Sequence, residues 1–169
     1  MRSTRTVSSA VLAIAMVVGI GIGSAAQDGD PMAPAAVQGW VFDEAHVADG
    51  TSEEVDGVLV RRGPQYSYRF VSGDPRLSGT ALWTGNGNRF RAEPLFEVQR
   101  VTWEITNEGG RWFGPGSAIR GQGFGETNTI ELTGDGDYAG LSAYLIMDFG
   151  LGGGRFRGAI FPGEMPPLP

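Results

Sequence analysis

The stretch Leu141–Phe149 reads Leu-Ser-Ala-Tyr-Leu-Ile-Met-Asp-Phe, and apolar residues occupy every second position in it. Its odd-numbered positions are all apolar: Leu141, Ala143, Leu145, Met147 and Phe149. The positions between them are mixed, with Ser142 and Asp148 among them. Because side chains alternate between the two faces of a strand, this pattern predicts a β-strand with one wholly apolar face.

Similar short runs, rich in β-branched and aromatic residues and bounded by Gly, Asn, Asp or Pro, recur along the chain. They predict strands at Val37–Phe42, Glu54–Arg61, Gln65–Val71, Leu77–Thr84, Leu95–Thr106, Trp112–Ile119, Thr127–Thr133 and Arg155–Phe161. Turns are expected at Gly85–Asn88, Asn107–Gly110, Gly134–Asp137 and Gly150–Gly154, where Gly and Asn supply the conformations that tight hairpins need. Asp43–Asp49 is expected to be a loop or a single helical turn. The fold class predicted is all-β: an antiparallel meander of about eight strands closed into a β-barrel, with an open β-sandwich as the alternative.

The beginning of the chain has the pattern of a secretory signal peptide. Arg2 and Arg5 precede an apolar run at Ala10–Gly23, and Ser24-Ala25-Ala26 is a small-residue cleavage site. We therefore interpret residues 1–26 as a signal peptide, with a retained membrane anchor as the alternative. Residues 27–36 are expected to be a flexible lead-in, 37–163 the barrel domain and 164–169 a flexible tail. The predicted location is secreted, either extracellular or in the cell envelope, with no stable membrane insertion after cleavage.

Composition excludes several classes of site. The 169-residue chain has no Cys and a single His, so disulfides, thiol chemistry and multi-His metal sites are excluded, and we expect neither a metal nor a cofactor. All 13 basic residues are Arg. Without the predicted signal peptide the chain has 11 Arg and 19 acidic residues, which gives a net charge of −8. This negative net charge argues against nucleic acid and anionic membranes as partners. His46, in an acidic segment, is expected to be a surface residue.

Two segments share the form Gly-x-Gly-x-aromatic-x-Gly, namely Gly134–Gly140 and Gly152–Gly158. This form resembles the glycine-rich strand motif of the allene oxide cyclase and dirigent barrels. Together with Gly73–Gly79 and Asn107–Trp112, it is also similar to segments of uncharacterised secreted bacterial β-barrel proteins. The resemblance implies an eight-stranded barrel whose interior can hold an apolar ligand. The catalytic residues of the plant enzymes have no residue-by-residue match here.

Some residues are candidates for chemistry. Asp74 and Arg76 could act as an acid and a guanidinium at a barrel rim, although Asp74-Pro75 is also a common turn sequence. Glu104 could exchange protons if its strand directed it into the barrel. Asp135 and Asp137 resemble the start of a calcium loop but lack its further ligands, so a solvated turn is expected.

Aromatic side chains could line a ligand cavity or simply pack the core. The ligand-binding candidates are Trp83, Trp103, Tyr138 and Tyr144. The favoured function is a non-enzymatic barrel that binds a small apolar molecule or acts as a scaffold. The alternatives are a cyclase- or dirigent-like enzyme that guides an organic substrate, and a structural or adhesive envelope protein. The oligomeric state is left open.

Overall fold

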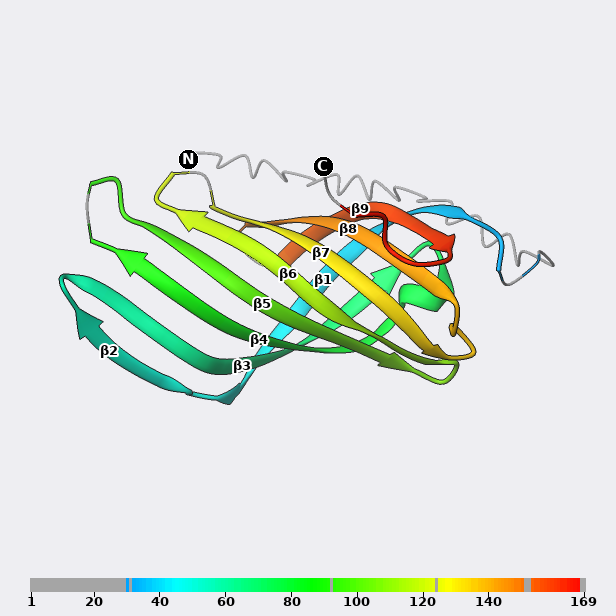
Figure 1. The fold of residues 1–169 in the computed structure, drawn as a ribbon, viewed down its shortest axis with the longest axis horizontal. Coiled ribbons are helices and arrows are strands. Elements are labelled where there is room, and N and C mark those ends of the chain that lie inside the picture. Colours follow the sequence, from blue (N-terminus) through cyan, green and yellow to red (C-terminus); the bar gives the residue numbers. More distant parts are fainter. Residues whose placement is uncertain (1–29, 31, 92, 124, 151–152, 168–169) are drawn as a thin grey trace, which may run out of the picture.

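The computed structural model describes residues 30, 32–91, 93–123, 125–150 and 153–167, which form one antiparallel sheet of nine strands. Their bounds are β1 (Ala35–Ala48), β2 (Thr51–Val55), β3 (Val58–Ser72), β4 (Gly79–Phe90), β5 (Phe96–Asn107), β6 (Gly110–Gly121), β7 (Gly125–Gly136), β8 (Leu141–Gly150) and β9 (Gly153–Pro162). A short 3-10 helix, η1 (Pro75–Leu77), joins β3 to β4. Figure 1 shows the long tilted strands, with β2 at one end and η1 at the other.

The sheet closes on itself. Strands β3 to β9 pair in chain order, β9 pairs with β1, and β1 returns to pair with β3. This closure confirms the eight-stranded barrel, and the open β-sandwich alternative is wrong. β2 is a ninth strand that continues the line of β1 along β3, from Thr51 opposite Arg62 to Val55 opposite Val58. The β2–β3 hairpin thereby extends the wall beyond the closed part of the barrel.

The β2–β3 hairpin corrects one sequence expectation. Glu54–Arg61 was expected to be a single strand, but the chain reverses at Asp56 and Gly57, which have φ of 50° and 78°. Two consecutive residues with positive φ make the tight hairpin turn that Asp-Gly favours. The Asp-Gly turn lies between Val55 and Val58–Val60, which favour a strand on both sides of it, and this is why a single strand was expected.

Gly85–Asn88 was expected to be a turn and instead lies within β4. The two glycines face the interior, and a side chain there would collide with neighbours. A Cβ on Gly85 would lie 2.1 Å from the Trp83 ring, and one on Gly87 would lie 2.5 Å from Glu97 Oε1. These glycines therefore make room inside the barrel rather than reversing the chain.

β1 also runs further than expected. Asp43–Asp49 was expected to be a loop or helical turn, yet β1 continues to Ala48. Asp43 has φ of 58° and lies at a break in register between Phe42 and Ala45. Aspartate tolerates this left-handed conformation better than most residues, and such a bulge bends a strand. Pairing of β1 with β9 ends at Val41 opposite Gly154, one residue after β9 begins, and beyond it β1 pairs only with β3.

The two glycine-motif copies differ in structure. Gly134–Gly140 spans the end of β7 and the turn that follows, and there a Cβ on Gly134 would lie 2.3 Å from the Tyr138 carbonyl oxygen. The second copy lies in β9, apart from Gly152, which is outside the described residues. In this copy the Phe156 ring covers Gly39, and Gly158 approaches the backbone of Tyr144. Both copies allow close approach, but only the second is an extended strand.

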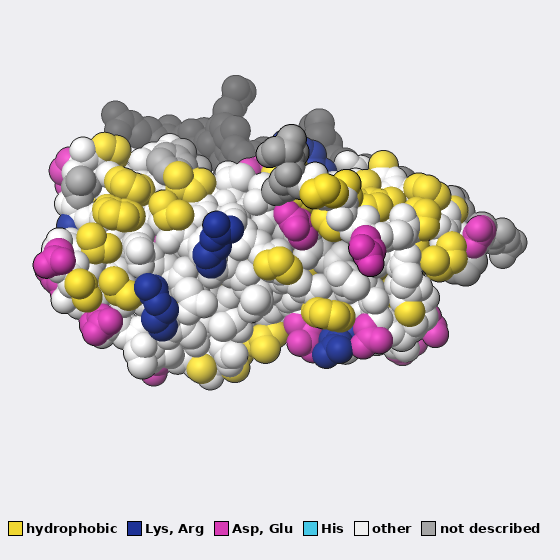
Figure 2. Space-filling model, viewed as in Figure 1, with side chains coloured by type: hydrophobic (Ala, Val, Ile, Leu, Met, Phe, Trp, Pro, Cys, Tyr) yellow, Lys and Arg dark blue, Asp and Glu magenta, His cyan; other side chains and the backbone are white. Residues whose placement is uncertain are grey.

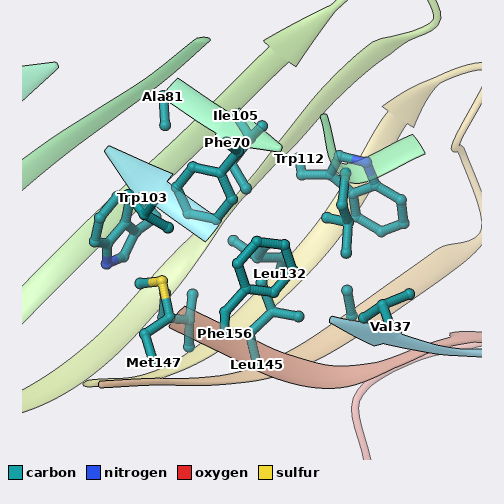
Figure 3. Close-up of a cluster of buried hydrophobic side chains, with 14 of the residues drawn as sticks. Val37, Phe70, Ala81, Trp103, Ile105, Trp112, Leu132, Leu145, Met147 and Phe156 are labelled. Carbon is teal, nitrogen blue, oxygen red and sulfur yellow. The ribbon is translucent and has the colours of Figure 1, made fainter. Parts of the chain in front are cut away.

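The interior is filled at the η1 end with apolar side chains. Phe70, Trp112, Leu132, Leu145 and Phe156 are among its buried members. Figure 3 shows these side chains converging from opposite walls, with Trp103 on one side and Trp112 and Val37 on the other. Burial of this apolar surface is the main stabilising contribution for a domain without cross-links.

The outer surface carries its own hydrophobic residues. Val98 and Ile119 pair across β5 and β6 and are 49% and 45% exposed. Figure 2 shows hydrophobic side chains gathered toward both ends of one face, with arginines between them. Exposed acids at β2, including Glu53 and Glu54, border the unpaired strand edge. Charged edges of this kind disfavour edge-to-edge association.

β1 begins two residues before the expected start of the barrel domain. Ala35 and Ala36, assigned to the lead-in from sequence, belong to β1 and pair with β9, and Met32 packs against the core. The predicted signal peptide, residues 1–26, lies outside the described residues and stays a prediction. Within the described part of the chain, no helix has the length and hydrophobicity needed to cross a membrane.

Candidate functional site

The η1 end of the barrel is plugged. Asp74 caps η1 by accepting a hydrogen bond from the Arg76 backbone N–H, and Leu77 of η1 is fully buried. Arg76 also binds the Asp74 carboxylate through Nε at 3.0 Å and Nη2 at 2.7 Å. Burial alone would raise the pKa of Asp74, but the hydrogen bonds and charge of Arg76 hold it below its usual value. Asp74 and Arg76, which the sequence offered either as a turn or as a rim site, therefore form the turn that helps to close the barrel.

Polar side chains anchor this plug to the wall. The Trp112 indole N–H donates to the Arg76 carbonyl at 2.8 Å, and Asn107 Nδ2 donates to the carbonyls of Arg76 and Ser78. Tyr138 stacks on Trp112 with centroids 5.1 Å apart, and its hydroxyl donates to Asn107 Oδ1 at 2.7 Å. These contacts satisfy the buried groups around η1, so Tyr138 is positioned here as part of the closure.

The opposite end of the barrel is open and holds a cavity of about 900 Å³, which we call the mouth cavity. The β1 bulge forms one side through Phe42 and Glu44, and the β8–β9 connection forms another through Gly150 and Gly153. At this end β9 begins only at Gly153, and beyond Val41 the strand β1 pairs with β3 alone.

Aromatic rings form much of the cavity wall. Its aromatic lining comprises Phe42, Tyr66, Tyr68, Trp83 and Phe149. The Tyr66 and Trp83 centroids are 5.6 Å apart, and those of Tyr68 and Phe149 are 5.9 Å apart. Trp103 packs beneath them, 5.5 Å from Tyr68 and nearly parallel to Phe149 at 6.4 Å. Rings at these spacings hold one another in place and present faces and edges to the cavity.

A row of charged side chains crosses four neighbouring strands near the mouth. In register, Arg89 on β4 lies opposite Glu97, Glu97 opposite Arg120, and Arg120 opposite Glu126. Glu97 is 2% exposed and accepts from Arg89 Nε at 3.0 Å and Nη2 at 2.8 Å, with Arg61 Nη1 3.8 Å away. Arg120 Nε is 3.8 Å from Glu126 Oε2. The alternation of sign neutralises the buried carboxylate.

Two lining groups have shifted acidity. Burial raises the pKa of Glu126 above its usual value, against the opposing effects of the Asn128 amide and Arg120. Burial, reinforced by the Glu44 carboxylate, raises the pKa of Tyr68 far above its usual range. Tyr68 therefore keeps its proton at neutral pH, and Glu126 holds its proton to a higher pH than a solvated glutamate.

The sequence candidates are dispersed over the barrel. Trp83 lines the mouth cavity and Trp103 lies beneath it, while Tyr138 is at the plugged end. Tyr144 alternates with inward-facing Ala143 and Leu145 and thus belongs to the outer face. Glu104 is also outward, with its side chain 46% exposed and 4.0 Å from Arg111.

Sequence reasoning missed the charged and amide residues of the mouth. Glu97 and Gln99 lie on the same face of β5 as Val101, Trp103 and Ile105, and all five are buried. Their two-residue spacing from the apolar residues of this face was the signal in the sequence that these polar side chains point inward. It was obscured because polar residues occupy both faces of the strand between Glu97 and Arg100.

The remaining candidates are surface residues. His46 Nε2 lies 3.0 Å from Asp49 and its side chain is half exposed. Asp135 pairs with Arg111 at 2.9 Å on the exposed turn. Among the residues that the structure describes, no group of three or more His, Asp or Glu is arranged to hold a metal ion.

Comparison with known proteins yielded no match to a family model, to a curated protein or to a solved structure.

Proposed function

We propose that this protein is a ligand-binding barrel that holds one small amphipathic organic molecule in the mouth cavity. The observation that carries the proposal is the cavity itself: about 900 Å³, walled by aromatic rings and edged by a few polar groups. Sites for small molecules have this size and this mixture of apolar wall and sparse polar groups. The export suggested by residues 1–26 and the kinship with cyclase and dirigent barrels are parts of the same proposal.

The contrast between the two barrel ends supports a dedicated site. Leu77, Trp112 and Tyr138 fill or cap one end, whereas several residues at the other end are glycines, which have no side chain to fill the opening. Gly150 and Gly153 border the opening, and Gly87 faces the interior between Glu97 and Gln99. An eight-stranded barrel has an interior that side chains can fill completely or leave open for one small ligand.

The polar groups change the expected ligand from an apolar to an amphipathic one. Arg61 and Arg120 line the cavity together with Asp43, Glu44 and Glu126. Opposite charges are thus interspersed, and the wall favours neither a cation nor an anion strongly. A molecule with an apolar body and an uncharged polar end complements such a surface.

An acid–base enzyme is the second candidate, and one observation favours it. Glu126 is a partly buried carboxyl with a raised pKa on the cavity wall, and such a group can donate a proton to a bound substrate. In this alternative the barrel resembles the cyclase and dirigent enzymes in guiding an organic substrate. Replacing Glu126 by Gln would then abolish turnover while leaving binding intact.

Titration with the neutral fluorescent probe N-phenyl-1-naphthylamine tests the binding proposal. We expect saturable binding to one site, with Tyr68→Leu weakening the affinity about tenfold because it removes a ring contact of about 1.4 kcal/mol. Tyr144→Leu, which alters a tyrosine on the outer face, is the matched control and should bind as the wild type does. Absence of saturable binding, or equal losses in both variants, would overturn the proposal. If the probe binds as expected, native mass spectrometry of protein purified from its own host would identify the natural ligand.

A further inference from the structure

Three buried polar atoms near the mouth have no hydrogen-bond partner within the described part of the chain. They are Gln99 Oε1, Asn128 Oδ1 and Trp103 Nε1. Their residues are 4%, 0% and 2% exposed, respectively. Leaving a buried polar atom unpaired costs on the order of 1–3 kcal/mol, so three in one region call for a reason.

The two amides flank a gap in the wall. Gln99 on β5 and Asn128 on β7 both lie opposite Ala118 of β6, which separates them by only a methyl group. On its other side Gln99 faces Gly87, which has no side chain. Gln99 also lines the mouth cavity. The two amides, with only a methyl group between them, form a polar niche in the wall, and of the two Gln99 is the one that lines the cavity.

The indole of Trp103 contributes a donor to the same region. Its ring packs against Tyr68 and Phe149, both of which line the cavity. Figure 3 shows the indole nitrogen at the end of the ring nearest Met147, on the side away from Phe70, Ile105 and Trp112. The N–H is thus an unpaired donor in the layer directly beneath the rings that line the cavity.

The charged side chains nearby are occupied with one another. Arg89 and Arg61 contact Glu97, and Arg120 is paired with Glu126. The Nδ2 group of Asn128 donates to Glu126 Oε1 at 2.9 Å, which leaves its carbonyl oxygen as the free atom. The unpartnered atoms are thus two acceptors and one donor, all of them uncharged.

From this set we infer that the ligand carries a neutral head group of the primary carboxamide type, joined to a planar hydrophobic body. Its N–H groups donate to Gln99 Oε1 and Asn128 Oδ1, its carbonyl accepts from Trp103 Nε1, and its rings contact Tyr68 and Phe149. The inference rests on the proposed function and specifies the ligand class for the same cavity. A carboxylate head would place lone pairs against two carbonyl oxygens, and a hydrocarbon would leave all three atoms unpaired.

A matched series of naphthalenes tests this inference. The probes are 2-naphthamide, 2-naphthoate and 2-methylnaphthalene, which share a ring system and differ in the head group. Calorimetric or fluorescence titration of the wild-type protein should show the amide binding at least about tenfold more tightly than the other two. Equal affinities for all three would overturn the inference and leave the ligand-binding barrel standing. If none of them binds, the proposed function fails as well.

Variants at Gln99 separate a ligand site from a packing accident. Gln99→Leu removes an unpaired buried oxygen, so the protein should unfold at a higher temperature while losing about tenfold in affinity for 2-naphthamide. Its affinity for 2-methylnaphthalene should not fall. Gln38→Leu, on the exposed face of β1, is the control and should leave the amide preference unchanged. A Gln99→Leu protein that unfolds at a lower temperature and keeps its amide preference would overturn the inference, since an ordered water would then be the partner of the amide.

Discussion

Glu97 and its arginine partners form a buried ion pair near the mouth, and removing the acid should affect stability differently from removing an arginine. Glu97 is 2% exposed, whereas Arg89 and Arg61 are 31% and 24% exposed. Removing an arginine leaves a charge that water cannot reach, while removing the glutamate leaves charges that can be hydrated. The two halves of the pair should therefore differ in their effect on the free energy of unfolding.

The magnitudes follow from these exposures. Arg89→Met deletes both short hydrogen bonds to Glu97 and leaves only Arg61 at 3.8 Å. Breaking a buried pair in this way costs about 3–5 kcal/mol, and the remaining Arg61 places the expected loss near the lower end, at about 3 kcal/mol. Glu97→Met should cost about 1 kcal/mol, as for pairs whose remaining partner is solvated. The double variant Arg89→Met/Glu97→Met should be within about 1 kcal/mol of the wild type, because an apolar pair replaces an ionic one.

Urea unfolding followed by tryptophan fluorescence measures these differences as shifts in the midpoint at constant slope. Arg91→Met is the control, since Arg91 pairs with Glu54 at 3.0 Å but both side chains are more than half exposed. Its expected change is below about 0.5 kcal/mol. The reasoning is refuted if Glu97→Met is as harmful as Arg89→Met, or if the double variant loses as much as the two single variants together.

Two further predictions concern the glycines and the acidity of the mouth. Gly158→Ala should cost about 3 kcal/mol or more in the free energy of unfolding, because its Cβ would lie 1.9 Å from the Tyr144 carbonyl oxygen. Gly73→Ala, whose Cβ would have no neighbour nearer than 4.0 Å, should be neutral or slightly stabilising. Chemical denaturation that gives the two variants the same free energy of unfolding would contradict this account. Folding raises the pKa of Glu126 above the unfolded value of 4.5. The contribution of this carboxyl to the free energy of unfolding is therefore complete below pH 4.5, and it is lost as the pH rises through the folded pKa. Glu126→Gln should therefore lose less stability than the wild type over that interval in thermal unfolding scans, and identical pH profiles would show that the carboxyl is not perturbed.

Local sequence patterns predicted most of the barrel correctly. The alternation in Leu141–Phe149 matches β8, and Asn107–Gly110 is the β5–β6 turn. These features depend on neighbours along the chain, because parity and turn chemistry are properties of a few consecutive residues. The same reasoning failed at Gly85–Asn88, where glycines serve contacts across the barrel rather than a reversal of the chain.

The candidate site was harder to predict because it depends on which strand ends meet. Asp74 and Arg76 were conspicuous in sequence, yet they cap η1 and help to plug the barrel. Gln99 and Asn128 attract no attention as isolated residues and become neighbours only through the small Ala118 between them. Register across three strands, and not any motif, makes the niche.

By itself the sequence determined that this chain is a glycine-rich, antiparallel all-β protein without disulfides, since composition and two-residue alternation are local quantities. Only the tertiary structure decided which end of the barrel is plugged and which is open. That outcome depends on where β9 begins relative to β1, which pairs with β3 alone beyond Val41, and on where Leu77 lies after closure. Strand pairing across long sequence separations determines both, and no short stretch of residues specifies such pairing.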